Sequence, residues 1–252
     1  MGTSRVTSHM PAYKLLALET STERLSLAIR LGDEVFVREV DAGQRHSELT
    51  LPLMYELLAD AGTDLADLDV VAFGQGPGSF TGVRIACGLT QGLAFGGGKG
   101  VVPVPTQMAL AEQSGAQKVV VALDARMGEI YVAAYCRSED ATGWTAEVAP
   151  MLVKPDALPA IAGDCWHGIG SGFDVPALAA SLAARYGAQI AHVTLNALPS
   201  AREVAAIAAR QLAKLGLDSA LSPEHAAPLY LRNKVAMTIA ERAAHHLKKA
   251  AA

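Results

Sequence analysis

A short apolar run, a glycine-rich turn and a helix-forming stretch follow one another in the first third of the chain. Residues 70–73 (VVAF) predict a buried strand, residues 74–78 (GQGPG) a sharp turn, and residues 79–95 a helix. Glycine allows the backbone to turn sharply where side chains would clash. A strand that enters a helix through such a turn is typical of α/β proteins.

The segments around this unit continue the α/β pattern. Three successive strands, a helix and a later strand are predicted over residues 14–18, 25–30, 35–40, 47–61 and 101–104. A weaker second series of strands, followed by two helices, is predicted over residues 119–123, 130–135, 147–153, 176–186 and 201–215. We therefore expect two related ribonuclease-H-like halves, each with a mixed sheet flanked by helices.

The predicted boundary between the halves lies near residues 103–106. It gives an N-terminal domain over residues 13–105 and a C-terminal domain over residues 106–234. A helix near residues 235–250 is a candidate to return to the first domain. Residues 1–12 are interpreted as a leader derived from an expression vector, because Ser8-His9-Met10 resembles a vector scar.

Composition limits the classes of function. Of 252 residues, 51% are hydrophobic and 18% are charged, as in a globular protein. The formal charge is −4 and the pI is about 6.0. Proteins that hold RNA by its backbone usually carry a basic patch, and the one basic run here is the short Lys248-Lys249 pair. Any RNA is therefore expected to be held mainly by another component.

Cysteine and histidine usage gives no ligand pattern. The three cysteines are widely spaced, which fits a reducing cytosol and predicts a cytoplasmic protein. No window of 18 uninterrupted apolar residues predicts a membrane span. His167 and His192 have no partner at ligand spacing, and His245-His246 lies in a charged C-terminal stretch. We predict no metal site.

The glycine turn has two interpretations. Free N–H groups at the start of a helix can bind an anion, and the candidate phosphate-type loop consists of Gly76, Pro77, Gly78, Ser79, Thr81, Gly82 and Arg84. Ser79 or Thr81 is a candidate cap for the helix. The glycines alone favour the other interpretation, a tight turn without a ligand.

The helices over residues 47–61 and 79–95 carry unusual surfaces. Apolar residues of the first occupy nearly every direction around its axis, whereas a helix covering one core needs only one apolar stripe. Glycines recur through the second, although each costs up to about 1 kcal/mol against alanine. Close approach of another backbone would explain them, either within the chain or from a partner. The pattern leaves both alternatives open.

Two polar clusters favour structural roles. His46-Ser47-Glu48 precedes the first of these helices, and adjacent residues rarely form a catalytic triad. Capping by Ser47, or a place at a partner surface, is the preferred interpretation. Asp124 and Arg126 form either an ion pair that fixes a turn or part of an inter-domain cleft, and we favour the ion pair.

Four blocks of sequence together resemble the bacterial TsaB (YeaZ) family. They keep the family's order over residues 14–237, and the glycine and Asp-Ala-Arg blocks are the specific ones. The blocks are LALETST (16–22), GPGSFTGVR (76–84), DARMGE (124–129) and PLYLR (228–232).

The resemblance implies an actin-like ATPase (ASKHA) fold and a part in forming N6-threonylcarbamoyladenosine in tRNA. It implies a TsaD-type transferase as partner, a TsaE-type ATPase in a larger complex, and a homodimer when the partner is absent. tRNA would bind only through the complex. ATP or ADP is a candidate ligand at or near the complex interface, and no other cofactor is expected.

The resemblance also implies where the partner binds. Family members dock through the first two helices of the N-terminal half, which here are residues 47–61 and 79–95. The candidate interface residues are His46, Leu49, Leu53, Tyr55, Leu57, Val83, Cys87, Gly88, Thr90 and Gln91.

Departures from catalytic relatives imply an inactive paralogue with no catalytic residue. Thr106 and Leu110 stand roughly where the transferase carries two metal-binding histidines. Glu19 replaces the aspartate of actin-type ATPases and, with Asp124 and Arg126, is a candidate for the inter-domain cleft. The alternatives are an ASKHA-type small-molecule kinase or ATPase and, less favoured, a glycoprotease-type peptidase, because no nucleophile, base or metal set assembles from the sequence.

Overall fold

The first sheet is built from the N-terminal part of the chain. The structure is a computed structural model that describes residues 13–232. Strands β1 and β4 are apolar along their length because helices cover both faces of this sheet. β1 pairs antiparallel with β2 and parallel with β4. The strands are β1 (Lys14–Glu19), β2 (Arg24–Leu31), β3 (Glu34–Asp41), β4 (Val70–Gly74) and β5 (Gly100–Val104), in the order β3-β2-β1-β4-β5.

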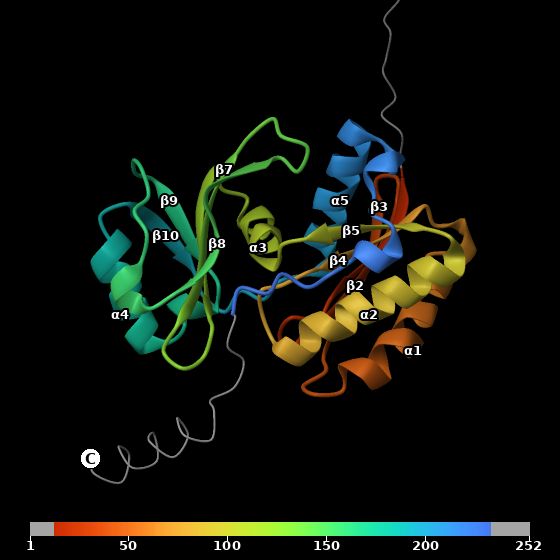
Figure 1. Ribbon diagram of the computed structural model, residues 1–252, viewed down its shortest axis with the longest axis horizontal. Coiled ribbons are helices and arrows are strands. Elements are labelled where there is room, and N and C mark those ends of the chain that lie inside the picture. Colours follow the sequence, from red (N-terminus) through yellow and green to blue (C-terminus); the bar gives the residue numbers. More distant parts are fainter. Residues whose placement is uncertain (1–12, 233–252) are drawn as a thin grey trace, which may run out of the picture.

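The second sheet repeats this topology (Figure 1). Its first strand again pairs antiparallel with the next strand in sequence and parallel with a later one. The strands are β6 (Lys118–Asp124), β7 (Ile130–Arg137), β8 (Trp144–Val153), β9 (Trp166–Ile169) and β10 (Ile190–Thr194), in the order β10-β9-β6-β7-β8. The predicted architecture, two α/β halves of related topology with mixed sheets flanked by helices, is confirmed.

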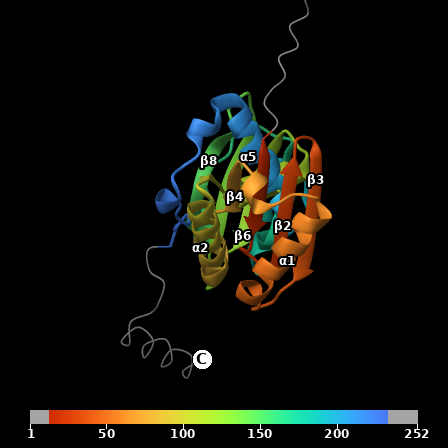
Figure 2. The same ribbon diagram turned by 90° about the vertical axis from the view of Figure 1, so that its right-hand side faces the viewer.

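Helices form the remaining layers. α1 (His46–Asp60) and α2 (Phe80–Gly97) lie next to each other on the outer face of the first sheet (Figures 1 and 2). α5 (Ala201–Leu215) covers the inner face of that sheet. α3 (Thr106–Ser114) packs against α5 and the second sheet. α4 (Pro176–Tyr186) covers the outer face of the second sheet.

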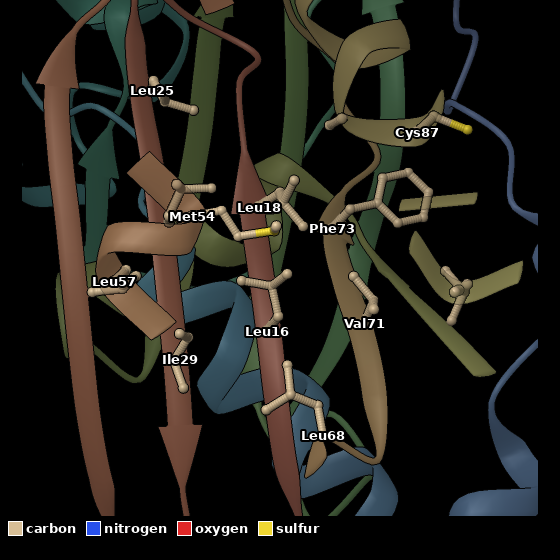
Figure 3. Close-up of a cluster of buried hydrophobic side chains, with 14 of the residues drawn as sticks. Leu16, Leu18, Leu25, Ile29, Met54, Leu57, Leu68, Val71, Phe73 and Cys87 are labelled. Atoms are coloured by element: carbon tan, nitrogen blue, oxygen red, sulfur yellow. The ribbon is translucent and has the colours of Figure 1, made fainter. Parts of the chain in front are cut away.

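The core beneath α1 and α2 positions the candidate interface. Met54 and Leu57 of α1 point toward the sheet, where they meet side chains such as Leu18 and Phe73 (Figure 3). Cys87 of α2 belongs to the same buried cluster, with its sulfur directed toward Ala226. All of these residues are at most 5% exposed. Because one face of each helix is anchored in this way, the opposite faces are held in a fixed relation to each other.

Helix α5 departs from the predicted division at residues 105 and 106. It falls in the range 106–234 that the sequence assigns to the second half, yet Val204, Ala208 and Leu212 pack on strands β1, β2 and β4 of the first sheet. The inner face of that sheet needs a cover, and the small apolar stripe of α5 supplies it. The candidate returning helix near residues 235–250 lies outside the described residues.

Glu112 joins the inner layers. Its carboxylate accepts hydrogen bonds from Arg210 of α5 (2.8 Å), Arg137 of β7 (2.8 Å) and Nε1 of Trp144 in β8 (2.7 Å). Burial raises the pKa of this carboxyl, but the hydrogen bonds from Arg210, Trp144 and Arg137 outweigh burial, so its pKa lies below the usual value. One largely buried carboxylate therefore connects α3, α5 and the second sheet.

Several predicted elements are confirmed and some were missed. The helices over 176–186 and 201–215 match α4 and α5, and β8 begins earlier than predicted. α3, β9 and β10 were not predicted. Among the described residues, no helix is long and apolar enough to cross a membrane.

Candidate partner interface and glycine-rich loop

The glycine-rich turn packs against the turn that follows β1. A Cβ atom at Gly74 would lie 1.9 Å from Oε2 of Glu19. At Gly82 it would lie 1.9 Å from the carbonyl oxygen of Thr20, and at Gly78 it would lie 2.6 Å from atoms of Ser21. Real Cβ atoms do not approach other atoms so closely. Three glycines are therefore required by the chain's own residues 19–21.

Backbone N–H groups of the candidate phosphate-type loop have partners within the chain. Ser79 donates from its N–H to the carbonyl of Ser21 (2.7 Å), and the Gly76 N–H donates to Oγ1 of Thr106 (3.2 Å). The Gly82 N–H donates to Oγ of Ser79 (3.3 Å), so Ser79 is the helix cap. Gly76, Pro77 and Gly82 are buried, Gly78 is half-buried, and Ser79, Thr81 and Arg84 are exposed.

Glu19 lies at the centre of this packing and is fully buried. Its carboxylate accepts from the N–H of Ser21 (2.7 Å) and the hydroxyl of Thr106 (3.0 Å). Burial raises the pKa of Glu19 above its usual value, although hydrogen bonds from Ser21, Thr106 and Thr20 act in the other direction. Across residues 13–232, no three His, Cys, Asp or Glu side chains lie close enough to hold a metal ion.

Asp124 and Arg126 form the ion pair that was the favoured interpretation. The guanidinium lies 3.1 Å from Oδ2 of Asp124, whose Oδ1 also accepts from the Arg126 N–H (2.8 Å). The pair fixes a turn in which Arg126 and Met127 have positive φ angles of 64° and 57°. A role of Glu19, Asp124 and Arg126 in an inter-domain cleft stays a prediction.

Half of the ten candidate interface residues lie in the core of this chain. His46, Leu57, Val83, Cys87 and Thr90 are at most 5% exposed. These five side chains are buried within this chain, so the structure does not present them for direct contact with a partner. Of the other five, Tyr55 and Gly88 are exposed, whereas Leu49, Leu53 and Gln91 are half-buried.

Sequence reasoning missed other exposed residues of the same two helices. Phe95 is 79% exposed, and Leu51 and Phe80 are also exposed apolar side chains; the predicted Tyr55 is 60% exposed. Gly88, Gly92 and Gly96 form a line along α2, and a Cβ atom on any of them would meet nothing within 4 Å. The spacing of four residues between these glycines in the sequence indicates that they lie on one side of the helix. We call these exposed side chains and glycines the α1–α2 face.

The segment 221–232 covers one flank of α2. Its Ala226 carbonyl accepts from Nε2 of Gln91 (2.9 Å) and from Sγ of Cys87 (3.4 Å). Farther along, the hydroxyl of Tyr230 accepts from Nε of Arg84 (2.8 Å), and Arg232 pairs with Glu129 (2.7 Å) in the turn between β6 and β7. The guanidinium of Arg84 also lies 3.5 Å from the centre of the Phe80 ring. This segment therefore connects α2 to the second half.

The cluster His46-Ser47-Glu48 does not assemble as a triad. Nε2 of His46 is buried and has no hydrogen-bond partner among residues 13–232, and the carboxylate of Glu48 instead accepts from Arg45 (3.1 Å). The prediction that Ser47 caps α1 is wrong, because Arg45 is the N-cap residue and makes no side-chain cap.

Known proteins match both the sequence and this geometry. A family model described as "TsaD: tRNA N6-adenosine threonylcarbamoyltransferase" matches residues 39–240. A tRNA threonylcarbamoyladenosine biosynthesis protein TsaB from Escherichia coli (strain K12) is 35% identical over 234 residues, which cover 88% of this chain and 96% of that protein. The protein of the same name from Haemophilus influenzae is 34% identical, with coverages of 90% and 96%. The chain belongs to the TsaB (YeaZ) family.

Solved structures agree with this assignment to the TsaB family. A Pseudomonas aeruginosa protein described as similar to peptidase YEAZ superposes with a TM-score of 0.78 at 31% identity, over 87% of this chain and 100% of that one. YeaZ from Pseudomonas aeruginosa gives a TM-score of 0.76 at 30% identity with the same coverage. The predicted family is thus confirmed, and the chain spans nearly the whole length of these TsaB relatives.

Proposed function

We propose that this TsaB-family chain is a non-catalytic subunit that binds and activates a TsaD-type transferase, which forms N6-threonylcarbamoyladenosine next to the tRNA anticodon. The names of the curated relatives and of the matching family model support this pathway. The proposal includes a TsaE-type ATPase in the larger complex, tRNA held only through the complex, self-association without the partner, and a cytoplasmic location.

The observation that carries the proposal is the α1–α2 face. Gly88 and Gly92 weaken an exposed helix, and nothing within the described chain packs on them. A partner helix that crosses there would approach the α2 backbone closely, which only glycine permits. Tyr55 of α1 and Phe95 of α2 are exposed aromatic side chains, the type that often dominates binding energy.

The non-catalytic part of the proposal rests on how the polar residues are used. Glu19, the counterpart of an ATPase aspartate in the predicted resemblance, is fully buried and engaged by Ser21 and Thr106. In the predicted resemblance, the transferase carries its two metal-binding histidines roughly where α3 has Thr106 and Leu110. Both of these residues are fully buried. A nucleotide at or near the complex interface stays part of the proposal.

Size-exclusion chromatography with light scattering tests whether this chain binds the transferase. A one-to-one complex with the cognate TsaD-type transferase is expected at micromolar concentration. Gly92→Glu places a charged side chain on the α1–α2 face and should abolish the complex. Ala184→Glu, at an exposed position on α4 of the second half, is the matched control and should leave the complex intact. Absence of a complex with the wild-type chain would overturn the proposal.

A further inference from the structure

Two histidines far apart in the sequence become neighbours in the second sheet. His167 lies on β9 and His192 on the edge strand β10, where the two residues are partners in the strand register. Their ring centres are 4.9 Å apart, and the ring planes meet at 63°. Spacing in the sequence does not indicate this pair, because the pairing of β9 with β10 brings the two histidines together.

The distance between the rings suits a shared metal ion. Zinc binds imidazole nitrogen at about 2.0–2.1 Å and prefers tetrahedral angles, which places the centres of two bound rings about 5 Å apart. The observed separation of 4.9 Å between the ring centres matches this spacing. A site that is formed before the metal arrives loses little side-chain entropy on binding.

The surroundings of the two rings differ: His167 is half-buried, whereas His192 is exposed. The Nε2 atom of His167 is 2.8 Å from the Thr194 hydroxyl. This hydrogen bond orients the ring, and Nδ1 is the ring nitrogen that would bind the metal. In the described part of the chain, His192 makes no side-chain hydrogen bond and is exposed.

We propose that His167 and His192 bind one divalent transition-metal ion of the zinc class, with Thr194 as the residue that positions His167. Imidazole nitrogen suits Zn²⁺, Cu²⁺ and Ni²⁺ better than Mg²⁺ or Ca²⁺. Within residues 13–232 no third His, Cys, Asp or Glu joins this pair. The remaining coordination positions are therefore filled by water or a partner's group, and the ion is exchangeable.

Titration calorimetry with ZnCl₂ on the full chain tests the site. His245 and His246 are other histidines, so all variants are made in a parent chain that carries alanine at both positions. The parent should bind one Zn²⁺. His192→Asn and His167→Asn should each remove detectable binding, because one imidazole remains. Thr194→Val should weaken the affinity about tenfold, as expected when the hydrogen bond that orients a ligand is lost.

Two control variants test whether other exposed histidine or cysteine side chains bind the Zn²⁺ ion. His225→Asn removes another exposed histidine, and Cys165→Ser removes an exposed thiol close in sequence to His167. Both should bind Zn²⁺ as the parent does. Zn²⁺ should also raise the melting temperature of the parent but not that of His192→Asn, because an ion that binds only the folded state stabilises it. Absence of binding at millimolar Zn²⁺, or equal affinity of His192→Asn and the parent, would overturn the proposal.

Discussion

Oε2 of Glu19 lies 1.9 Å from the position that a Cβ atom on Gly74 would occupy. The glycine at the end of β4 therefore makes room for the carboxylate at the end of β1. Gly78 and Gly82 do the same for Ser21 and Thr20. A motif with the composition of a phosphate-binding loop thus has a sufficient explanation in the packing of this chain on itself.

Gly74→Ala is expected to destabilise the protein by about 1–3 kcal/mol, the usual range for overpacking a filled interior. Gly88→Ala is the matched change on the α1–α2 face. It should stabilise the isolated chain by up to about 1 kcal/mol, because nothing lies within 4 Å of the added methyl group and alanine favours a helix. Urea unfolding measures both, and equal effects of the two changes would contradict this account.

Burial of Glu19 predicts a dependence of stability on pH. Its pKa in the folded protein is raised, so its contribution to stability is fully present below the unfolded-state pKa and is lost as pH rises through the folded-state pKa. Glu19→Gln does not titrate. The free energy of unfolding of wild type relative to Glu19→Gln should therefore fall from mildly acidic to neutral pH. If the difference in the free energy of unfolding between wild type and Glu19→Gln is constant or rises with pH, the pKa of Glu19 is not raised in the folded protein.

Glu112→Gln is expected to destabilise the protein by about 2 kcal/mol, because Arg210 and Arg137 lose a shared, largely buried charged partner. The effect should shrink at acid pH. The folded-state pKa of Glu112 is lowered, so its contribution is lost as pH falls through that value. Glu48→Gln breaks the exposed pair with Arg45 and should cost under about 1 kcal/mol in the same urea assay.

Tyr55→Ala and Leu57→Ala separate the α1–α2 face from the core. Tyr55 is exposed, so its truncation should leave the free energy of unfolding nearly unchanged and weaken the complex with the transferase about tenfold or more. Leu57 is buried, so its truncation should lower stability by about 2–4 kcal/mol. Calorimetry measures the affinity for the transferase, and urea unfolding measures the free energy of unfolding. A Tyr55→Ala variant that binds the transferase normally would contradict the role of the α1–α2 face in binding.

The ATPase alternative makes an opposite prediction for the isolated chain. N–H groups of Gly76, Ser79 and Gly82 already donate to oxygens within the chain. The chain alone is therefore expected to show no tight binding and no turnover of ATP with Mg²⁺. Calorimetry and a phosphate-release assay check this, and turnover that is lost in Gly78→Ala would support a kinase or ATPase.

The fold was largely predictable because most elements carry a strong local pattern. The strand-turn-helix unit over residues 70–95 and the amphipathic α5 are examples. α3 was missed because it lies between α5 and the second sheet, with Ala109 and Leu110 in two different core clusters, so its sequence shows no single apolar stripe. β9 was missed because it is short and contains His167 and Gly168.

The candidate site was predicted less completely. Family resemblance located the two helices, but helical residues such as Cys87 and Thr90 proved to face the chain's own interior. Burial depends on which side of a helix the sheet lies, and α1 is apolar in nearly every direction. The contacts of segment 221–232 with α2 depend on residues distant in the sequence, for which no local pattern exists.

The rate of threonylcarbamoyladenosine formation in a reconstituted reaction tests the central claim most directly. The transferase is held at a fixed concentration and titrated with this chain, with Gly92→Glu, or with Ala184→Glu. The wild-type chain and Ala184→Glu should raise the rate until they equal the transferase in concentration, and Gly92→Glu should not raise it. A rate that is independent of this chain, or that Gly92→Glu raises equally, would contradict the account.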